Sequence, residues 1–67
     1  MQFTVTDVEN TTIHLYNMLG QAVFQTYSRD KDAVLNVGFL PQGVYVLKVE
    51  RDGFSFVRKV VLSEQGF

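Results

Sequence analysis

The dipeptide Asp52-Gly53 is the sequence feature that most constrains the fold, because it separates two apolar-rich runs at residues 44–51 and 54–62. An Asp-Gly pair between alternating hydrophobic residues is the strongest short-range signal for a β-hairpin, since a type I′ turn needs positive φ at both central positions. The first run carries an apolar residue at every second position: Tyr45, Leu47 and Val49. The two runs therefore predict a pair of antiparallel strands.

Turn length decides which residues of this hairpin lie opposite one another. A two-residue turn pairs Val49 with Phe56 on the core face, whereas a three-residue loop places Val57 opposite Leu47. A shift of one residue moves every side chain of a strand to the other face. The sequence leaves both registers open.

Four further strands are expected upstream, because runs rich in Val, Thr, Phe and Tyr alternate with turn signals about every eight to ten residues. The complete set of expected strands is residues 3–8, 12–17, 22–27, 33–37, 44–51 and 54–62. This spacing is typical of a sandwich or barrel, and no segment shows a convincing helical pattern. The sequence therefore predicts a small all-β domain.

Loops between these strands carry residues suited to tight turns. Residues 18–21 are expected as a four-residue hairpin loop in which Gly20 adopts positive φ. Pro41 presets φ for a turn in the loop before residue 44, and Gly43 is expected to take left-handed geometry there. Residues 28–32 are expected as a charged, solvated loop.

The expected core is formed by alternate apolar residues and by large aromatic side chains. Alternation places these aliphatic residues inward: Ile13, Leu15, Leu35 and Val37. A small domain without tryptophan needs the large buried area of aromatic rings, so these are expected to fill the core: Phe3, Phe24, Tyr45 and Phe56. The run at residues 22–27 is apolar on both faces, so its inward face stays undecided.

Composition excludes several classes of function. The 67 residues carry a net charge of −1 with no basic stripe, so nucleic acid is not an expected partner. No apolar run is long enough to cross a bilayer. The chain has no cysteine, so disulfides and thiolate metal sites are excluded. Its length leads us to expect a single domain over residues 1–67.

No constellation of residues in the sequence predicts catalysis, a bound metal or a cofactor. The single histidine, His14, is expected as a half-exposed strand residue. Asp30 and Asp32 lack the other oxygen ligands of a recognised calcium loop, and a solvated turn is the better interpretation. No catalytic residue is assigned, and the chain is not expected to be an enzyme.

An uncovered edge is expected at the first strand, since the sequence enters it almost directly. An exposed apolar edge invites pairing with another strand. The sequence therefore predicts pairing with further residues of a longer protein or with another chain, for example a homodimer formed through this edge or by a strand swap.

Three stretches occur in a recognisable order: IHLYNMLGQAV at residues 13–23, LPQGVYVLKV at 40–49 and RKVV at 58–61. In this order and spacing they resemble the type A-like C-terminal sorting domain of the type IX (Por) secretion system of Bacteroidetes. The resemblance runs over residues 12–61, and the second stretch contributes most to it. The positions that match the family's motifs are Leu19, Gly20, Leu40, Pro41, Gly43, Tyr45, Arg58 and Lys59.

The resemblance implies an immunoglobulin-like antiparallel β-sandwich of six to seven strands at the C-terminus of a larger secreted cargo protein. It implies recognition by the outer-membrane type IX translocon, followed by removal of the domain by a sortase-like peptidase. The cargo then stays at the cell surface of a Gram-negative bacterium. Arg58 and Lys59 in the final strand are the positions that look most like a recognition surface.

Two other functions compete with sorting. One is a carbohydrate-binding or adhesive β-sandwich of a secreted protein, which needs an exposed row of aromatic residues such as Tyr16, Tyr27 and Phe54 on one surface. The other is a purely structural spacer domain.

Overall fold

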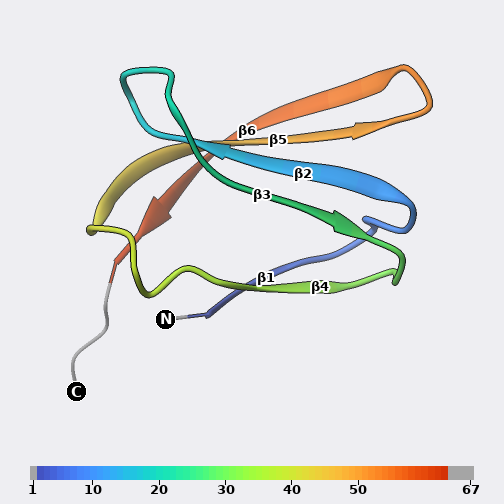
Figure 1. Ribbon diagram of the computed structural model, residues 1–67, viewed down its shortest axis with the longest axis horizontal. Coiled ribbons are helices and arrows are strands. Elements are labelled where there is room, and N and C mark those ends of the chain that lie inside the picture. The colour runs from blue at the N-terminus through green and yellow to red at the C-terminus, as the bar shows by residue number, and fades with distance from the viewer. Residues whose placement is uncertain (1, 64–67) are drawn as a thin grey trace.

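The computed structural model describes residues 2–63 as six antiparallel β-strands in two sheets (Figure 1). The strands are β1 (Gln2–Val5), β2 (Thr11–Tyr16), β3 (Ala22–Ser28), β4 (Ala33–Asn36), β5 (Gly43–Arg51) and β6 (Phe54–Leu62). One sheet contains β1 and β4, and the other has the order β3-β2-β5-β6. This arrangement confirms the predicted small all-β sandwich.

The first strand is shorter than the sequence suggested. It ends at Val5 rather than at residue 8, because Asp7 has a φ of 59° and turns the backbone out of the extended conformation. Val8 is nevertheless buried, and its N–H donates to the Lys31 carbonyl oxygen at 2.8 Å. The loop after β1 therefore supplies a core residue without being part of a strand.

The β5–β6 hairpin adopts the two-residue turn. Asp52 and Gly53 have φ values of 48° and 84°, and Arg51 pairs with Phe54. Positive φ at both central positions is what a type I′ turn requires. Val49 consequently lies opposite Phe56, which selects one of the two registers that the sequence left open.

The core lies between the two sheets and is made almost entirely of aliphatic residues. Its buried members are Val8, Ile13, Leu15, Leu35, Val37, Tyr45, Leu47, Val60 and Leu62. The four aliphatic residues expected inward from β2 and from the segment around β4 are all buried. Phe3 and Phe24 are partly buried and pack against this cluster, and β3 turns Phe24 and Thr26 toward the core side. Within residues 2–63, Tyr45 is the one aromatic residue that is fully part of the core.

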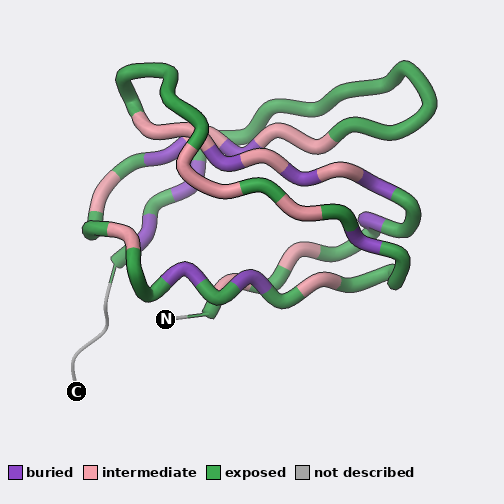
Figure 2. Tube along the Cα trace, in the orientation of Figure 1, coloured by how far each residue is buried: buried purple, intermediate pink, exposed green. Residues whose placement is uncertain are grey.

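The two sheets differ in extent, and this leaves the far end of the β5–β6 hairpin uncovered (Figure 2). Strands β1 and β4 have four residues each, whereas β5 and β6 have nine each. Phe54 and Phe56 project from the core side of β6 but remain 72% and 71% exposed. The expectation that Phe56 fills the core is therefore wrong, because no strand of the smaller sheet lies over it.

No helix that could span a membrane occurs within residues 2–63. Every buried side-chain nitrogen or oxygen in the same range has a hydrogen-bond partner. Among these groups, Thr11 Oγ1 donates to the Glu9 carbonyl oxygen at 2.9 Å and Ser28 Oγ donates to the Asp30 carbonyl oxygen at 2.8 Å. These two bonds fix the loops that flank β2 and β3 at one end of the sandwich.

Candidate recognition surface

The loops that carry the sequence motifs lie together at one end of the sandwich. Figure 1 shows the β2–β3 loop, the β4–β5 loop and the C-terminal end of β6 on the left, opposite the β5–β6 turn. Five of the motif residues belong to these two loops or to the first residue of β5: Leu19, Gly20, Leu40, Pro41 and Gly43. Tyr45 lies further along β5, and Arg58 and Lys59 lie within β6.

The β2–β3 loop is organised by Asn17. Its Oδ1 accepts hydrogen bonds from the N–H groups of Leu19 and Gln21 at 2.9 and 3.0 Å. The Gly20 N–H donates to the Asn17 carbonyl oxygen at 3.0 Å, and Gly20 has the expected positive φ of 85°. Asparagine favours such turns because its side chain substitutes for a backbone acceptor. Asn17 was expected as the last residue of a strand over residues 12–17, although an asparagine before Met-Leu-Gly is a recognisable turn signal.

This loop presents its apolar side chains to solvent. Leu19 is 85% exposed and Met18 is also exposed, while Gly20 occupies the turn between Leu19 and Gln21. The hydrogen bonds of Asn17 therefore hold a rigid tip whose leucine makes no contribution to the core. An exposed leucine at a fixed position is available for contact with another protein.

The β4–β5 loop is closed by Tyr45. Its hydroxyl donates to the Pro41 carbonyl oxygen at 2.7 Å, while its ring is buried in the core. The Leu40 N–H donates to the Val37 carbonyl oxygen at 3.0 Å, and the half-buried Leu40 side chain packs against the core. Tyrosine bonds of this kind, from a strand back to a preceding corner, recur in immunoglobulin-type sandwiches.

Gly43 does not adopt the left-handed conformation expected of it. Its φ is 155°, which is a positive value that other residues rarely adopt but is well away from the left-handed value near 57°, and Gly43 is the first residue of β5. A Cβ at this position would lie 4.0 Å from Tyr45 Cε1, which is ordinary contact. A glycine therefore suits this position because of its positive φ at the start of β5, and not because of a tight left-handed turn.

Strand β6 forms an edge of the four-stranded sheet and is exposed along most of its length. Within the described residues 2–63 it pairs only with β5, and its residues from Phe54 to Lys59 are all exposed. Lys59 pairs with Val46 on the outer face, whereas Arg58 pairs with the buried Leu47 and projects from the core-side face. Within residues 2–63, neither basic side chain forms an ion pair. The two expected recognition residues therefore lie on opposite faces of one strand.

His14 lies on the outer face, as expected for a half-exposed strand residue. Its Nε2 lies 2.8 Å from Glu50 Oε1, and its ring stacks on Tyr16 with 6.0 Å between ring centres. Glu50 also forms an ion pair with Lys48, with 3.7 Å between Oε2 and Nζ. This group ties β2 to β5 across the sheet, which gives His14 a structural role.

The three aromatic residues considered for carbohydrate binding do not share one surface. Tyr27 pairs with Thr12 on the outer face of the four-stranded sheet, and Tyr16 lies on that face as well. Phe54 instead projects from the opposite, core-side face. Nothing in this arrangement forms the aromatic row that a sugar-binding platform needs.

Asp30, Lys31 and Asp32 form an exposed loop, as the sequence predicted. Residues 2–63 contain no group of three or more acidic, histidine or cysteine side chains placed to hold a metal ion.

Comparison with known proteins identifies the family. The model of the family described as "Secretion system C-terminal sorting domain" matches residues 1–63. The chain belongs to this family of sorting domains. A search of curated proteins found no match.

Membership in the sorting-domain family defines the general role of the chain. It is a signal for secretion by the type IX (Por) system of Bacteroidetes, and it is a non-catalytic module. The motif residues of the sorting domain lie in two loops, on β5 (Gly43 and Tyr45) and on the exposed edge strand β6. Among the motif residues, Leu19 is 85% exposed, and Arg58 and Lys59 are exposed as well.

Proposed function

We propose that strand β6 is the part of this sorting domain that the outer-membrane type IX translocon binds. The observation that carries the proposal is that β6 is a nine-residue edge strand whose N-terminal six residues are all exposed. Its outer backbone edge has no partner strand within residues 2–63. An extended strand of another protein can add to such an edge, so that main-chain hydrogen bonds supply affinity and alternate side chains supply specificity.

The side chains of β6 support this role. Soluble proteins usually protect a long edge strand with charges, a bulge or a covering segment. Here Val57, Lys59 and Val61 lie exposed on the outer face, while Arg58 lies on the other. Strand β6 thus exposes apolar side chains on both faces, which another protein can contact, and two adjacent basic side chains, which can bind acidic groups of that protein.

The loops at the motif end give the strand a fixed context. The Asn17 and Tyr45 hydrogen bonds hold the β2–β3 and β4–β5 loops in defined conformations at the end of the sandwich where β6 finishes, and the β4–β5 loop leads into Gly43 opposite Leu62. We infer that the translocon recognises the folded domain, with Leu19 as a second contact. After translocation a sortase-like peptidase removes the domain, and the cargo remains on the surface of the Gram-negative cell.

Export of a fluorescent reporter fused to residues 1–67 tests the proposal in a host that has the type IX system. A copy truncated after Asp52 lacks β6 and is expected to remain in the periplasm. Truncation also removes Val60 and Leu62 from the core, so a second variant is needed that leaves the fold intact.

The double variant R58S/K59S provides this test, because both side chains are exposed and neither forms an ion pair within residues 2–63. Its control is R29S/K31S, which removes the same amount of charge from an exposed loop. Export is expected to fall for the β6 variant and to stay unchanged for the loop variant. Equal export of the two variants would show that the basic pair of β6 is not what the translocon reads.

A further inference from the structure

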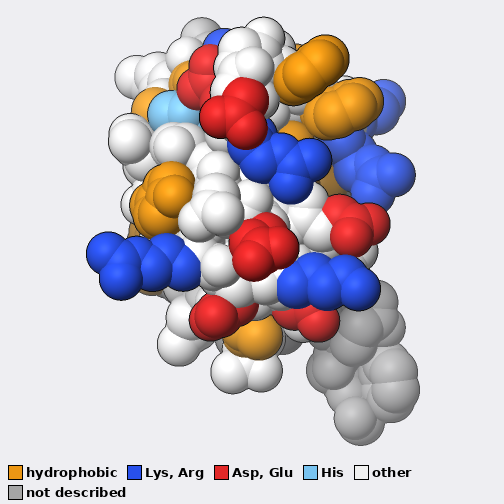
Figure 3. Space-filling view, turned by 90° about the vertical axis from the view of Figure 1, so that its right-hand side faces the viewer, with side chains coloured by type: hydrophobic (Ala, Val, Ile, Leu, Met, Phe, Trp, Pro, Cys, Tyr) orange, Lys and Arg blue, Asp and Glu red, His pale blue; other side chains and the backbone are white. Residues whose placement is uncertain are grey.

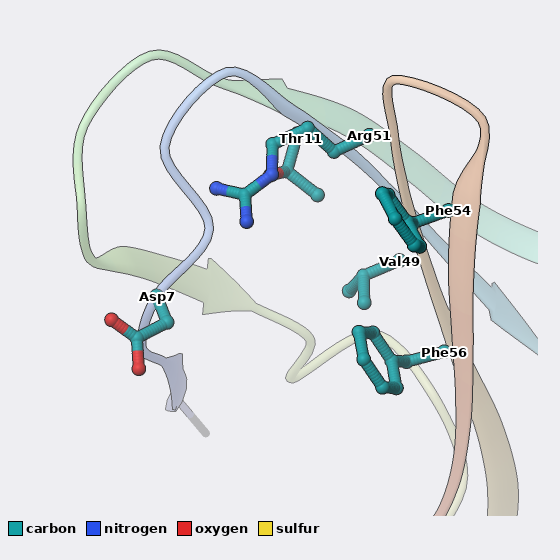
Figure 4. Close-up of a pocket in the computed structure, with 6 residues that line it drawn as sticks. All are labelled: Asp7, Thr11, Val49, Arg51, Phe54 and Phe56. Atoms are coloured by element: carbon teal, nitrogen blue, oxygen red, sulfur yellow. The ribbon is translucent and has the colours of Figure 1, made fainter.

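A groove separates β1 and the following loop from the uncovered end of the β5–β6 hairpin. Two adjoining hollows of about 280 and 540 Å³ share Asp7, Val49, Arg51 and Phe56 in their walls. In Figure 4, Phe54, Val49 and Phe56 project into this space from the hairpin, and Arg51 reaches over it from the end of β5. The floor of the groove is therefore apolar.

The groove exists because the smaller sheet stops at β1. Residues Val5 and Thr6 line one side of it, and Leu47 and Arg58 line the other. Strand β4 is the only neighbour of β1 within residues 2–63, so the opposite edge of β1 faces the groove. Residues of an antiparallel strand direct alternate N–H and C=O groups to either side, so part of the β1 backbone points toward this space without a strand partner.

A strand placed beside β1 would complete the smaller sheet. It would lie about 4.8 Å from β1 and about 10 Å above the β5–β6 hairpin, the normal spacings within and between sheets. Side chains on its inner face would then cover Phe54 and Phe56, which are large apolar groups left in solvent on the core side of their own sheet. The geometry thus suits an extended segment rather than a small molecule or a helix.

The charges around the groove select the kind of segment. Arg51 and Arg58 both line the groove, against a single carboxylate from Asp7. Glu9 and Asp52 lie outside these two hollows, in an adjoining one that shares Arg51, so Arg58 is the arginine farther from acidic side chains. Neither arginine forms an ion pair within residues 2–63, although Arg51 Nη1 donates to the Glu9 carbonyl oxygen at 3.5 Å. Figure 3 faces this end of the molecule and shows exposed hydrophobic side chains beside basic ones, with acidic side chains interspersed on the same face. An apolar segment that also carries a carboxylate complements this combination.

We propose that this groove binds an extended segment of a partner protein, which adds to the free edge of β1, packs apolar side chains on Phe54 and Phe56 and places a carboxylate at Arg58. The segment is a β-strand with alternating apolar residues. This site shares Arg58 with the proposed translocon surface, but it uses the core-side face of β6 and the edge of β1 instead of the outer backbone edge of β6. The inference does not depend on the sorting role.

A second copy of the chain is a poorer match for the groove. Its own exposed strand, β6, carries Arg58 and Lys59 and would bring positive charge toward Arg51 and Arg58. Like charges facing each other in an interface are unfavourable. The charge of the groove therefore favours a partner strand over self-association through β6.

Binding of two synthetic peptides to the chain of residues 1–67, measured by fluorescence anisotropy, tests the proposal. One peptide alternates valine and threonine with a central glutamate, and the other has lysine in place of that glutamate. The glutamate peptide is expected to bind about tenfold more tightly, the size expected for one charge-assisted contact. The net charge of the domain is −1, so long-range attraction alone favours the lysine peptide and cannot produce this result.

Three variants at exposed positions locate the site. Arg58→Glu is expected to reverse the peptide preference, and Phe56→Ser to weaken binding of both peptides. Val61→Ser, on the outer face of the same strand and 65% exposed, is the matched control and is expected to bind as the unaltered chain does. Circular dichroism of each variant checks that the fold is retained.

Amide chemical shifts complete the test. On binding, the shifts are expected to change in Gln2–Val5 and around Phe56. Absence of binding, equal affinity for the two peptides, or changes confined to the outer edge of β6 would each overturn the proposal. Self-association that Phe56→Ser abolishes, seen by light scattering without peptide, would instead identify a second copy as the occupant and would also overturn it.

Discussion

The hydroxyl group of Tyr45 donates a 2.7 Å hydrogen bond to the carbonyl oxygen of Pro41, four residues earlier in the chain. The ring of Tyr45 is buried among core residues, whereas Pro41 is exposed in the β4–β5 loop. One side chain therefore joins the interior of the sandwich to the loop that carries the Leu-Pro-Gln-Gly motif.

Replacement of this hydroxyl is expected to lower stability. Tyr45→Phe keeps the buried ring but leaves the part-buried Pro41 oxygen without its partner, which is expected to cost about 1.5 kcal/mol. A loss of this size corresponds to a fall of about 6–12 °C in Tm for a domain of this length. The control is Tyr27→Phe, which removes a longer, exposed bond of 3.3 Å to Asn10 and is expected to change Tm very little. Thermal unfolding followed by circular dichroism provides the measurement, and equal shifts for the two variants would contradict this account of Tyr45.

Asn17 is expected to stabilise the β2–β3 hairpin through its side-chain oxygen. Asn17→Ala removes the acceptor of the Leu19 and Gln21 N–H groups and is expected to lower the free energy of unfolding by about 1 kcal/mol, because both bonds are exposed. Asn17→Asp keeps an acceptor at the same place and loses only the 2.9 Å bond to Gln21 Oε1, so its loss should be smaller. The free energy of unfolding of both variants is measured by urea unfolding. An equal loss of free energy for Asn17→Asp and Asn17→Ala would contradict this role of the side-chain oxygen.

The conformation of Gly20 predicts a graded series of substitutions. A Cβ at this position meets no atom within 4 Å, so any loss of stability reflects the φ of 85° and not a clash. Gly20→Val is expected to cost about 1–2 kcal/mol, since β-branched residues strongly disfavour positive φ. Gly20→Asn should cost clearly less, because asparagine tolerates this conformation. Urea midpoints that were the same for valine and asparagine would point to another cause.

Two neighbouring valines in β6 separate packing from surface exposure. Val60 is 6% exposed and belongs to the core, while Val61 points to the opposite face. Val60→Ala is expected to lower the free energy of unfolding by about 2 kcal/mol, the transfer term of the lost methyl groups plus the cavity left behind. Val61→Ala should stay within about 0.5 kcal/mol of the unaltered chain, as exposed substitutions usually do. Similar losses at the two positions would mean that β6 is buried on both faces in solution.

The strands could be predicted well from sequence because each contains several alternating residues that agree with one another. Five of the six predicted strands overlap the observed ones to within a residue or two at each end. The exception, β1, ends at Val5, before the turn at Asp7, because the positive φ of a single aspartate cannot be recognised in a pattern of alternating apolar residues. The family was also identified from sequence, by motifs whose residues set loop geometry or occupy the edge strand.

The exposure of the Phe56 side chain could not be predicted from the alternation of apolar residues. Its position opposite Val49 follows from the hairpin turn, but its exposure depends on how far the smaller sheet extends over it. That extent is a property of the whole fold and is not encoded in the local pattern. Arg58 and Lys59 were expected to belong to one recognition surface. They point to opposite faces of β6, because side chains alternate along a strand. Pairing of two copies through an uncovered edge stays a prediction.

Strand β6 comes last in chain order, yet it contributes Val60 and Leu62 to the core and pairs with β5 along its whole length. During synthesis, β1 to β4 leave the ribosome before the strand that closes the sandwich has been made. A protein whose translation stops before Phe54 would therefore lack both the edge strand and two residues of the core. Under the proposed role of β6, completion of the fold and presence of the export signal depend on the same last strand, so a chain truncated there carries neither.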